Sequence, residues 1–236
     1  MPSWRLPKID ALRGCAIVMM VIYHFNFDLD YFGLVDFDFN NSPGWQAFRI
    51  VIVSSFLGLV GFSLQLAARG GLDRGRYLSR LGWLVLCAAL VSLGSYLMFP
   101  ASMIFFGILH FIAVASVAGL LFLNYRAASL ITGVVLIALG LLVRHRVFDM
   151  AWLQWLGMMT HKPVTEDYVP LVPWFGVVLI GMYLGRRFVE TGRPAVLAAD
   201  SQRRAVRGLA WAGRHSLLIY MLHQPILIGM LWLILA

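Results

Sequence analysis

Long apolar runs, separated by short polar segments, extend through the whole sequence. A helix that crosses a bilayer needs about 20 consecutive, mostly apolar residues, and runs of about this length recur along the chain. The pattern therefore predicts an all-α fold, a membrane bundle of about seven transmembrane helices that forms a single domain over residues 1–236. The predicted spans cover residues 11–30, 46–68, 79–98, 103–123, 127–144, 170–187 and 215–235.

The composition agrees with this pattern, since 61% of the 236 residues are hydrophobic and only 13% are charged. Soluble domains are about half apolar and about a quarter charged, so an integral membrane protein is indicated. A net charge of +8 is also found in proteins that bind nucleic acid. The basic residues, however, lie in short segments between apolar runs and not along one polar face, which argues against a nucleic-acid partner. The first run also lacks a small-residue cleavage site, so we expect it to be a retained span and not a signal peptide.

The placement of Lys and Arg predicts the orientation, because cytoplasmic loops of membrane proteins carry an excess of these residues. If the N-terminus is cytoplasmic, all but four of the 19 basic residues fall on the cytoplasmic side, and the acidic segment 27–39 falls outside. We therefore predict a cytoplasmic N-terminus and an outer C-terminus. The four exceptions are Arg49, Arg144, Arg146 and Lys162.

The longest predicted outer connection covers residues 145–169 and contains the aromatic, Met-rich segment MAWLQWLGMM. This segment is too short to cross a bilayer, so we expect it to lie in the interface or to cap the bundle. Long connections often carry function, which makes a lid over an outer cavity a reasonable hypothesis. The alternative is a solvated tether.

Arg13 and His24 bracket a run in which every residue after Gly14 is apolar or aromatic. Each helical residue adds 100°, so these two positions differ by only about 20° around the axis and by about 16 Å along it. Asp10 lies within about 60° of Arg13, and Asp28 within about 40° of His24. The sequence thus predicts four ionisable side chains on one stripe of the first helix.

Each member of this stripe also has a simpler interpretation. Arg13 could extend to the inner headgroups, Asp10 could be an ordinary charge at a helix N-terminus, and His24 could hydrogen-bond to another helix. The alignment of all four favours a functional stripe, because ionisable residues inside a membrane usually face the bundle interior or a water-filled cavity. Imidazole is also the side chain best suited to proton transfer near neutral pH.

The segment IDALRGCAIVMMVIYH (9–24) resembles the first helix of the membrane acyltransferases, and its Arg-x10-His spacing is similar to the signature of acyltransferase family 3. Four further stretches resemble the heparan-alpha-glucosaminide N-acetyltransferase catalytic-domain family and its bacterial relatives. Together these segments cover five of the seven predicted spans in the expected order, as in a minimal bacterial catalytic core. The four stretches are FRIVIVSSFLGLVGFSLQLA (48–67), FFGILHFIAVAS (105–116), PLVPWFGVVLIGMYLG (170–185) and GRHSLLIYMLHQPIL (213–227).

The resemblance implies a bacterial inner-membrane enzyme that moves an acyl group, usually acetyl, from cytoplasmic coenzyme A to an outer acceptor. Acetyl-CoA or another acyl-CoA would be the co-substrate, and a sugar amine or hydroxyl the acceptor. In family terms Arg13 and His24 are the functional pair. We expect His24 to act as general base, oriented by Asp28, or to carry the acyl group itself as an acyl-imidazole.

Several other polar residues in predicted spans are candidates for substrate binding. His110 lies mid-span after Gly107, with a packing hydrogen bond as the alternative. His223 and Gln224 lie near Tyr220 on the last span, where Pro225 frees a backbone carbonyl that these side chains could instead satisfy. Trp174, at the start of the sixth span, could stack on a substrate or anchor the helix at the interface.

Most arginines on the predicted cytoplasmic side are explained by the excess of basic residues in cytoplasmic loops. Arg13, Arg69 and Arg186 are candidates for binding the phosphates of coenzyme A. No Walker or Rossmann phosphate loop and no HExxH or paired-cysteine metal pattern is present in the sequence, so no metal is expected. Cys15 and Cys87 lie in apolar runs and are interpreted as small core residues. The sequence is compatible with a homodimer as well as with a monomer.

Two other classes of function remain open from the residues alone. In a proton-coupled transporter of small molecules, the buried Asp and His side chains would form a relay and coenzyme A would not bind. No internal symmetry is detectable in the sequence, although many transporters are built from repeats. In a structural or assembly subunit, the buried histidines would be replaceable. The relay residues would be Asp10, His24, Asp28, His110 and His223.

Overall fold

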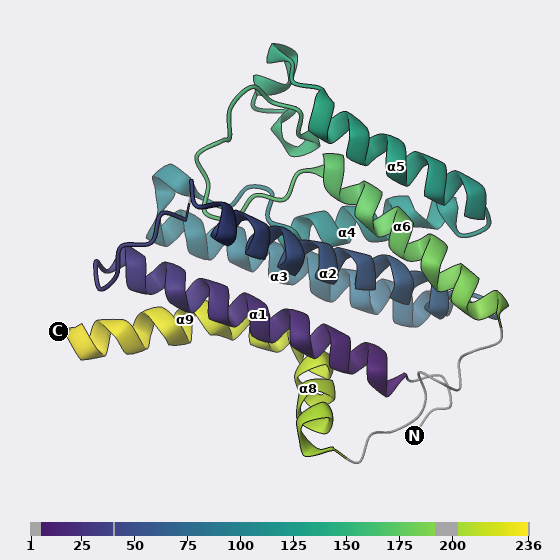
Figure 1. Ribbon diagram of the computed structural model, residues 1–236, viewed down its shortest axis with the longest axis horizontal. Coiled ribbons are helices and arrows are strands. Elements are labelled where there is room, and N and C mark those ends of the chain that lie inside the picture. Colours follow the sequence, from purple (N-terminus) through teal and green to yellow (C-terminus); the bar gives the residue numbers. More distant parts are fainter. Residues whose placement is uncertain (1–5, 40, 192–202, 236) are drawn as a thin grey trace. The chain divides into compact units, whose positions relative to one another are not determined.

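The computed structural model describes residues 6–39, 41–191 and 203–235, and these residues form helices and connecting loops without a strand (Figure 1). The backbone contacts divide the chain into two compact units. Unit 1 consists of Met1–Phe56 and Gly192–Ala236, and unit 2 of Leu57–Thr191. The all-α prediction is confirmed for the described residues.

Unit 1 combines helices from the first and the last part of the chain. It contains α1 (Pro7–Tyr31), the first half of α2 (Pro43–Ala67), α8 (Arg204–Arg214) and α9 (Ser216–Leu235). Helix α9 runs alongside α1, whereas α8 crosses α1 near its N-terminal end (Figure 1). A small core of Ile17, Met20 and Ile52, with Tyr220 packed against it, joins α1, α2 and α9.

Two glycines allow α8 to touch the backbone of α1. A Cβ atom at Gly14 would overlap the carbonyl oxygen of Leu209, and one at Gly213 would overlap the carbonyl oxygen of Asp10. Any larger residue at these two positions would push the helices apart. The close approach of α8 to α1 therefore depends on these two glycines.

Unit 2 contains the second half of α2, α3 (Arg74–Met98), α4 (Ile108–Gly119), α5 (Arg126–Leu142) and α6 (Leu171–Glu190). A Cβ at Gly181 would overlap the carbonyl of Gly58, and one at Gly176 would overlap that of Gly133, so α6 contacts both α2 and α5 closely. Short 3-10 turns connect or extend the helices. They are η1 (Pro100–Ser102), η2 (Leu120–Phe122), η3 (Arg146–Asp149) and η4 (Gln154–Leu156).

Five helices are long and apolar enough to cross a membrane, namely α1, α2, α3, α6 and α9. The other two predicted spans are helical but shorter, since the apolar helices there cover Ile108–Phe122 and Arg126–Leu142. At 17 residues α5 is about 26 Å long, a little less than a hydrocarbon core of about 30 Å. Helix α4 begins later than expected because Gly107 is extended and the segment before it turns through η1. The count of seven spans and the orientation remain predictions.

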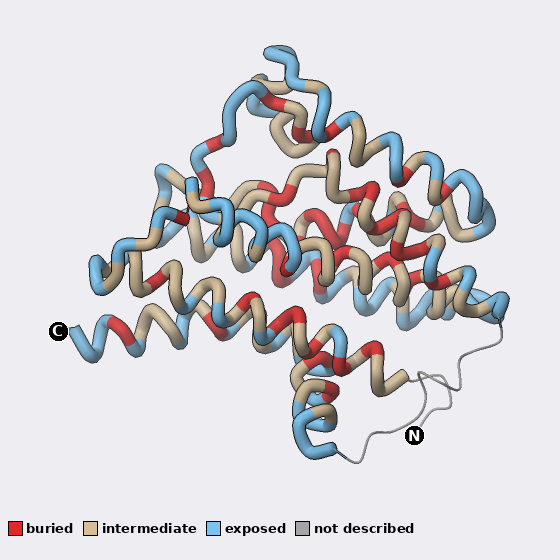
Figure 2. Tube along the Cα trace, viewed as in Figure 1, coloured by how far each residue is buried: buried red, intermediate tan, exposed pale blue. Residues whose placement is uncertain are grey.

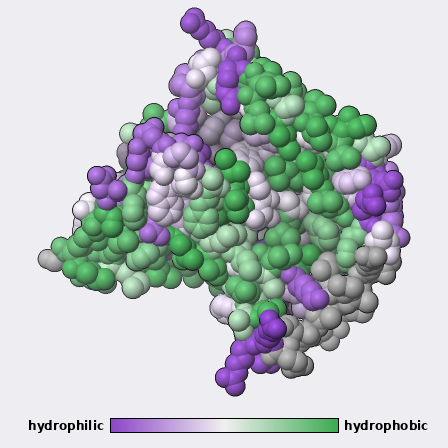
Figure 3. Space-filling view, in the orientation of Figure 1, coloured by the Kyte–Doolittle hydropathy of each residue, from purple (hydrophilic) through white to green (hydrophobic). Residues whose placement is uncertain are grey.

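Apolar residues occupy much of the face drawn in Figure 3. Many residues of the long helices are exposed, as the tube in Figure 2 shows. Examples of exposed apolar residues are Leu121 on η2, Leu142 at the end of α5 and Leu233 on α9. Isolated apolar residues are normal on soluble proteins, but whole helices of them are not. This distribution is typical of helices that face lipid.

The connection between α5 and α6 is compact and packs on unit 2. Its Tyr168 hydroxyl donates to the carbonyl of Gln154 at 2.6 Å, and Trp155 contacts Phe106 with ring centroids 5.9 Å apart. The backbone and hydroxyl of Thr160 both donate to Asp149, and these bonds lower the pKa of that carboxyl group. A segment held in this way agrees better with a cap than with a tether, and its role as a lid remains a prediction.

Candidate active site

Helix α1 is continuous from Pro7 to Tyr31 and carries all four residues of the predicted stripe. Near the N-terminal end of α1, Arg13 Nη1 lies 3.1 Å from Asp10 Oδ1, and both side chains are mostly buried. Arginine inside a membrane protein is costly unless it is paired. The contact with Asp10 supplies such a partner, so Arg13 does not need to extend to the headgroups.

The hydrogen bonding of His24 indicates its tautomer. His24 Nδ1 lies 2.9 Å from the carbonyl oxygen of Met20, one turn earlier on α1. Because a carbonyl only accepts, Nδ1 carries the proton in the neutral ring, and this tautomer is assigned from the bond. The other nitrogen, Nε2, then holds the lone pair that a general base requires.

Helix α9 brings a second histidine to the same place. The rings of His24 and His223 meet edge to face, with centroids 4.9 Å apart and an interplanar angle of 71°. His223 Nδ1 lies 2.6 Å from the carbonyl of Tyr220, so this ring has the same tautomer as His24. His223 Nε2 is buried and has no hydrogen-bond partner among the described residues. Two imidazole rings, each with a lone pair on Nε2, therefore meet between α1 and α9.

A carboxylate one turn after His24 on α1 and the amide that directly follows His223 on α9 complete this group. Gln224 Nε2 donates to Asp28 Oδ1 at 3.2 Å, and only 3% of Asp28 is exposed. Within the described part of the chain, Asp28 Oδ2 and Gln224 Oε1 are buried without a hydrogen-bond partner. Such an atom costs about 1–3 kcal/mol. Three of the buried unpaired atoms, including His223 Nε2, are thus acceptors gathered in one place, which suits a ligand that donates hydrogen bonds.

Tyr220 lies beside this group, with its ring centroid 5.6 Å from that of His223. It also packs against the core of unit 1, so its ring helps to fix the position of α9. The sequence left open whether His223 and Gln224 bind substrate or satisfy the carbonyl freed by Pro225. His223 bonds to Tyr220 and Gln224 to Asp28, so both side chains have other partners.

His110 belongs to unit 2, where backbone and side-chain bonds account for both ring nitrogens. The hydroxyl of Ser92 donates to the carbonyl of Ile104 at 2.6 Å, so it must accept from His110 Nε2, which lies 3.0 Å away. His110 Nδ1 accepts from the backbone N–H of Gly107 at 3.3 Å. This pattern agrees with a structural histidine that fixes the start of α4, and a direct role in binding remains a prediction.

Trp174 also belongs to unit 2, in the first turn of α6, where it is half-buried. This position at a helix end agrees with an interfacial anchor. Its predicted contact with a substrate is not tested by its position.

Arg69 and Arg186 line one pocket of about 500 Å³ in unit 2, at the end of α2, η2 and α6. Arg186 donates through Nη1 to the carbonyl of Leu123 and through Nε to Glu190, both at 3.0 Å. Glu190 also pairs with Arg126. The pocket is bordered by the turn Gly70–Gly71, in which both residues have the positive φ that favours glycine.

Sequence reasoning missed two features of these sites. It did not predict that His24 and His223 meet, because nothing local relates the first helix to the last. It also missed Glu190, although the spacing of four residues from Arg186 is a recognisable signal for an ion pair on a helix. No group of three or more His, Cys, Asp or Glu residues placed to hold a metal ion occurs in the described ranges.

The sequence model of the family described as heparan-alpha-glucosaminide N-acetyltransferase, catalytic, matches residues 5–225. The match covers nearly the whole chain and includes the first helix with Arg13 and His24 as well as His223 and Gln224. No match was found among curated proteins or among solved structures. The chain therefore belongs to the catalytic-domain family of the heparan-alpha-glucosaminide N-acetyltransferases, which indicates a membrane acetyltransferase.

Proposed function

We propose that the chain acts as one acyltransferase domain of a bacterial inner membrane. It moves an acetyl group from acetyl-CoA on the cytoplasmic side to an amine or hydroxyl of a carbohydrate on the outer side. Family membership supports acetyl transfer. The observation that carries the mechanism is the contact of His24 with His223, beside the buried pair of Asp28 and Gln224.

The general-base route needs one unprotonated imidazole nitrogen at the reacting centre. His24 Nε2 takes the proton from the acceptor as its nitrogen or oxygen attacks the thioester carbonyl carbon. The carbon–sulfur bond then breaks, and the coenzyme A thiolate leaves and takes this proton from the His24 imidazolium. In the second route His24 Nε2 attacks the thioester first, releases coenzyme A and holds the acetyl group as an acyl-imidazole until the acceptor arrives.

The buried acceptor atoms around His24 suit the other substrate. Asp28 Oδ2, Gln224 Oε1 and His223 Nε2 can each accept a hydrogen bond from the amine or hydroxyl groups of a sugar. Binding such donors would remove the cost of leaving these atoms unpaired. Tyr220, Trp174 and His110 are weaker candidates for contacts with the acceptor.

Arginine side chains are the candidates for binding acetyl-CoA. We assign Arg69 and Arg186, which line the pocket of unit 2, to the phosphates of acetyl-CoA, because guanidinium groups pair with phosphate in a bidentate manner. Arg13, paired with Asp10 on α1, is a third candidate. The scheme uses residues of one chain, so a homodimer would hold two such sites.

The test uses purified protein in nanodiscs, labelled acetyl-CoA and a panel of amino sugars and neutral sugars. We expect acetyl transfer by the wild type and a loss of about 10²–10⁴-fold in His24→Ala. The matched control is Asn26→Ala, which removes a polar side chain from the same helix two residues away. Near wild-type turnover in His24→Ala would rule out His24 as base or acyl carrier.

A binding measurement separates this proposal from proton-coupled transport. Acetyl-CoA should raise the thermal midpoint of the detergent-solubilised protein, whereas acetate or adenine alone should not, because a ligand stabilises only a protein that binds it. An unchanged midpoint at high acetyl-CoA concentration would contradict the proposed donor.

A further inference from the structure

Helix α8 has a basic face that the proposed reaction does not use. Its arginines lie within about 100° around the helix axis, and Trp211 falls in the same sector. All of these side chains are exposed, including Trp211 at 55%. The arginines are Arg203 at the N-cap, Arg204, Arg207 and Arg214.

The side of α8 next to this basic face is fixed to the protein. Ala210 and Gly213 are buried, and the backbone contacts of Gly213 with Asp10 and of Leu209 with Gly14 leave no space for rotation. These backbone contacts therefore fix the direction of the arginine face, which lies beside the contact with α1.

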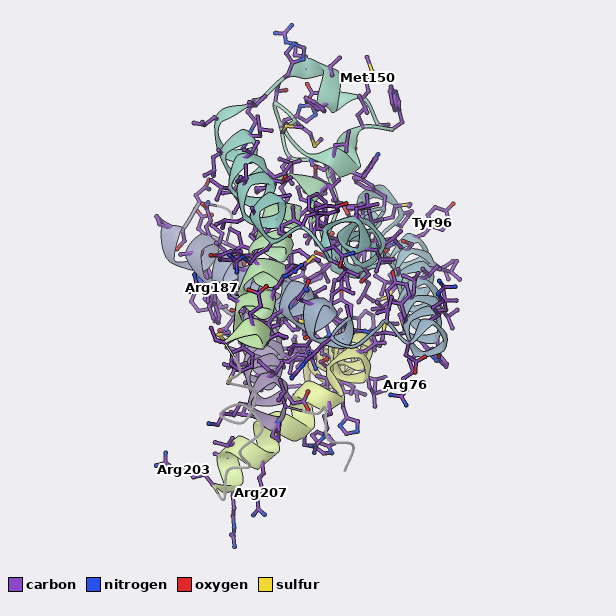
Figure 4. All side chains as sticks on the ribbon, turned by 90° about the vertical axis from the view of Figure 1, so that its right-hand side faces the viewer. Arg76, Tyr96, Met150, Arg187, Arg203 and Arg207 are labelled. Atoms are coloured by element: carbon purple, nitrogen blue, oxygen red, sulfur yellow. The ribbon has the colours of Figure 1, made fainter. Side chains whose placement is uncertain are left out.

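The crossing of the two helices places this face along the membrane surface. Asp10 and Gly14, which α8 contacts, lie in the first two turns of α1, a candidate membrane span. Because α8 runs across α1 and not along it, α8 lies roughly in the plane of the bilayer at that end (Figure 1). Figure 4 shows Arg203 and Arg207 extending away from the ribbon at the N-terminal end of α8.

We propose that α8 binds the headgroups of anionic phospholipids in the leaflet at the N-terminal end of α1. Arginine pairs with phosphate, and a tryptophan among the arginines suits the interface, where its ring is apolar and its N–H is polar. Amphipathic basic helices of this kind lie at headgroup depth and select anionic lipid. The proposal does not depend on acetyl transfer or on either substrate.

The test compares two triple variants of the full chain with equal loss of charge. The first is Arg203→Gln, Arg204→Gln and Arg207→Gln on α8. The control is Arg74→Gln, Arg76→Gln and Arg80→Gln on α3, three exposed arginines that the predicted orientation places at the same leaflet. Each protein is purified from mixed phosphatidylglycerol and phosphatidylcholine, and the retained lipids are counted by native mass spectrometry.

We expect the wild type and the α3 variant to retain phosphatidylglycerol selectively. The α8 variant should lose this selectivity by more than about fivefold, because one basic residue near an anionic surface contributes a factor of about this size. Equal losses in the two variants would show a general effect of charge and overturn the proposal. Unchanged selectivity in the α8 variant would overturn it as well.

A second measurement uses the unmodified protein, so it does not depend on the folding of a variant. Hydrogen exchange of the amides in Arg204–Arg214 is compared in nanodiscs of phosphatidylcholine with and without phosphatidylglycerol. We expect slower exchange in α8 when phosphatidylglycerol is present and no change in the first turns of α3. Equal exchange of α8 in the two lipids would contradict the proposal, as would equal protection by inorganic phosphate in neutral discs.

Discussion

His24 of α1 and His223 of α9 lie edge to face, with ring centroids 4.9 Å apart, although they come from opposite ends of the chain. Each ring holds its Nδ1 proton against a backbone carbonyl of its own helix. Both Nε2 atoms are therefore lone-pair nitrogens, so α1 and α9 together provide two hydrogen-bond acceptors side by side. A single helix cannot supply this arrangement.

Replacing His223 should impair turnover more than donor binding. We expect His223→Ala to lower kcat, or to raise KM for the acceptor, by at least about tenfold, because it removes a basic nitrogen beside His24. KM for acetyl-CoA should change little. Steady-state kinetics with each substrate varied in turn gives this separation, and His215→Ala, at an exposed histidine beyond α8, is the control. An equal rise in both KM values would indicate a general loss of structure.

Asp28 and Gln224 should show energetic coupling. Gln224→Leu leaves the buried Asp28 carboxyl group without its hydrogen-bond donor, at a cost of about 1–3 kcal/mol. Adding Asp28→Asn to this variant should recover part of the loss, because an amide is less costly to bury than a carboxylate. The thermal midpoints of the four members of a double-mutant cycle measure the coupling. Strictly additive effects would mean that the two side chains do not interact.

The contact of α8 with α1 predicts opposite results for two glycines of one helix. Gly213→Ala places a methyl group on the carbonyl of Asp10, so we expect destabilisation of about 1–3 kcal/mol or more. At Gly208 a Cβ atom meets nothing within 4 Å. Gly208→Ala should therefore be neutral or stabilise the helix by up to about 1 kcal/mol. Thermal unfolding of the two variants tests this, and equal midpoints would contradict the packing.

Substituting the arginines that line the pocket of unit 2 should weaken the binding of acetyl-CoA. Arg69→Gln and Arg186→Gln should raise KM for acetyl-CoA by about tenfold, since each removes a guanidinium from the pocket. The rise should be smaller for acetyl-dephospho-CoA, which has one phosphate fewer. Arg187→Gln is the control, because Arg187 is exposed and is not among the residues that line the pocket. If KM rises equally for both donors, these arginines do not bind the phosphate that dephospho-CoA lacks.

Local pattern was sufficient for most of the helices. Runs of about 20 apolar residues predicted the long helices α1, α2, α3, α6 and α9, because length and hydropathy are properties of one segment at a time. The same reasoning placed the start of the fourth span too early. There, the start of α4 depends on contacts with α3, where Ser92 binds both Ile104 and His110. Hydropathy carries no information about such contacts.

The sequence by itself determined the all-helical class, the five long apolar helices and the stripe of Asp10, Arg13, His24 and Asp28, because helical periodicity places these side chains on one face. Only the tertiary structure decided that His223 and Gln224 complete this stripe, that His110 is held by Ser92 and Gly107, and that Glu190 joins Arg126 to Arg186. Contacts between helices depend on which faces pack together. In this chain small residues such as Gly14 and Gly213 permit that packing, and their effect appears only when the partner helix is in place.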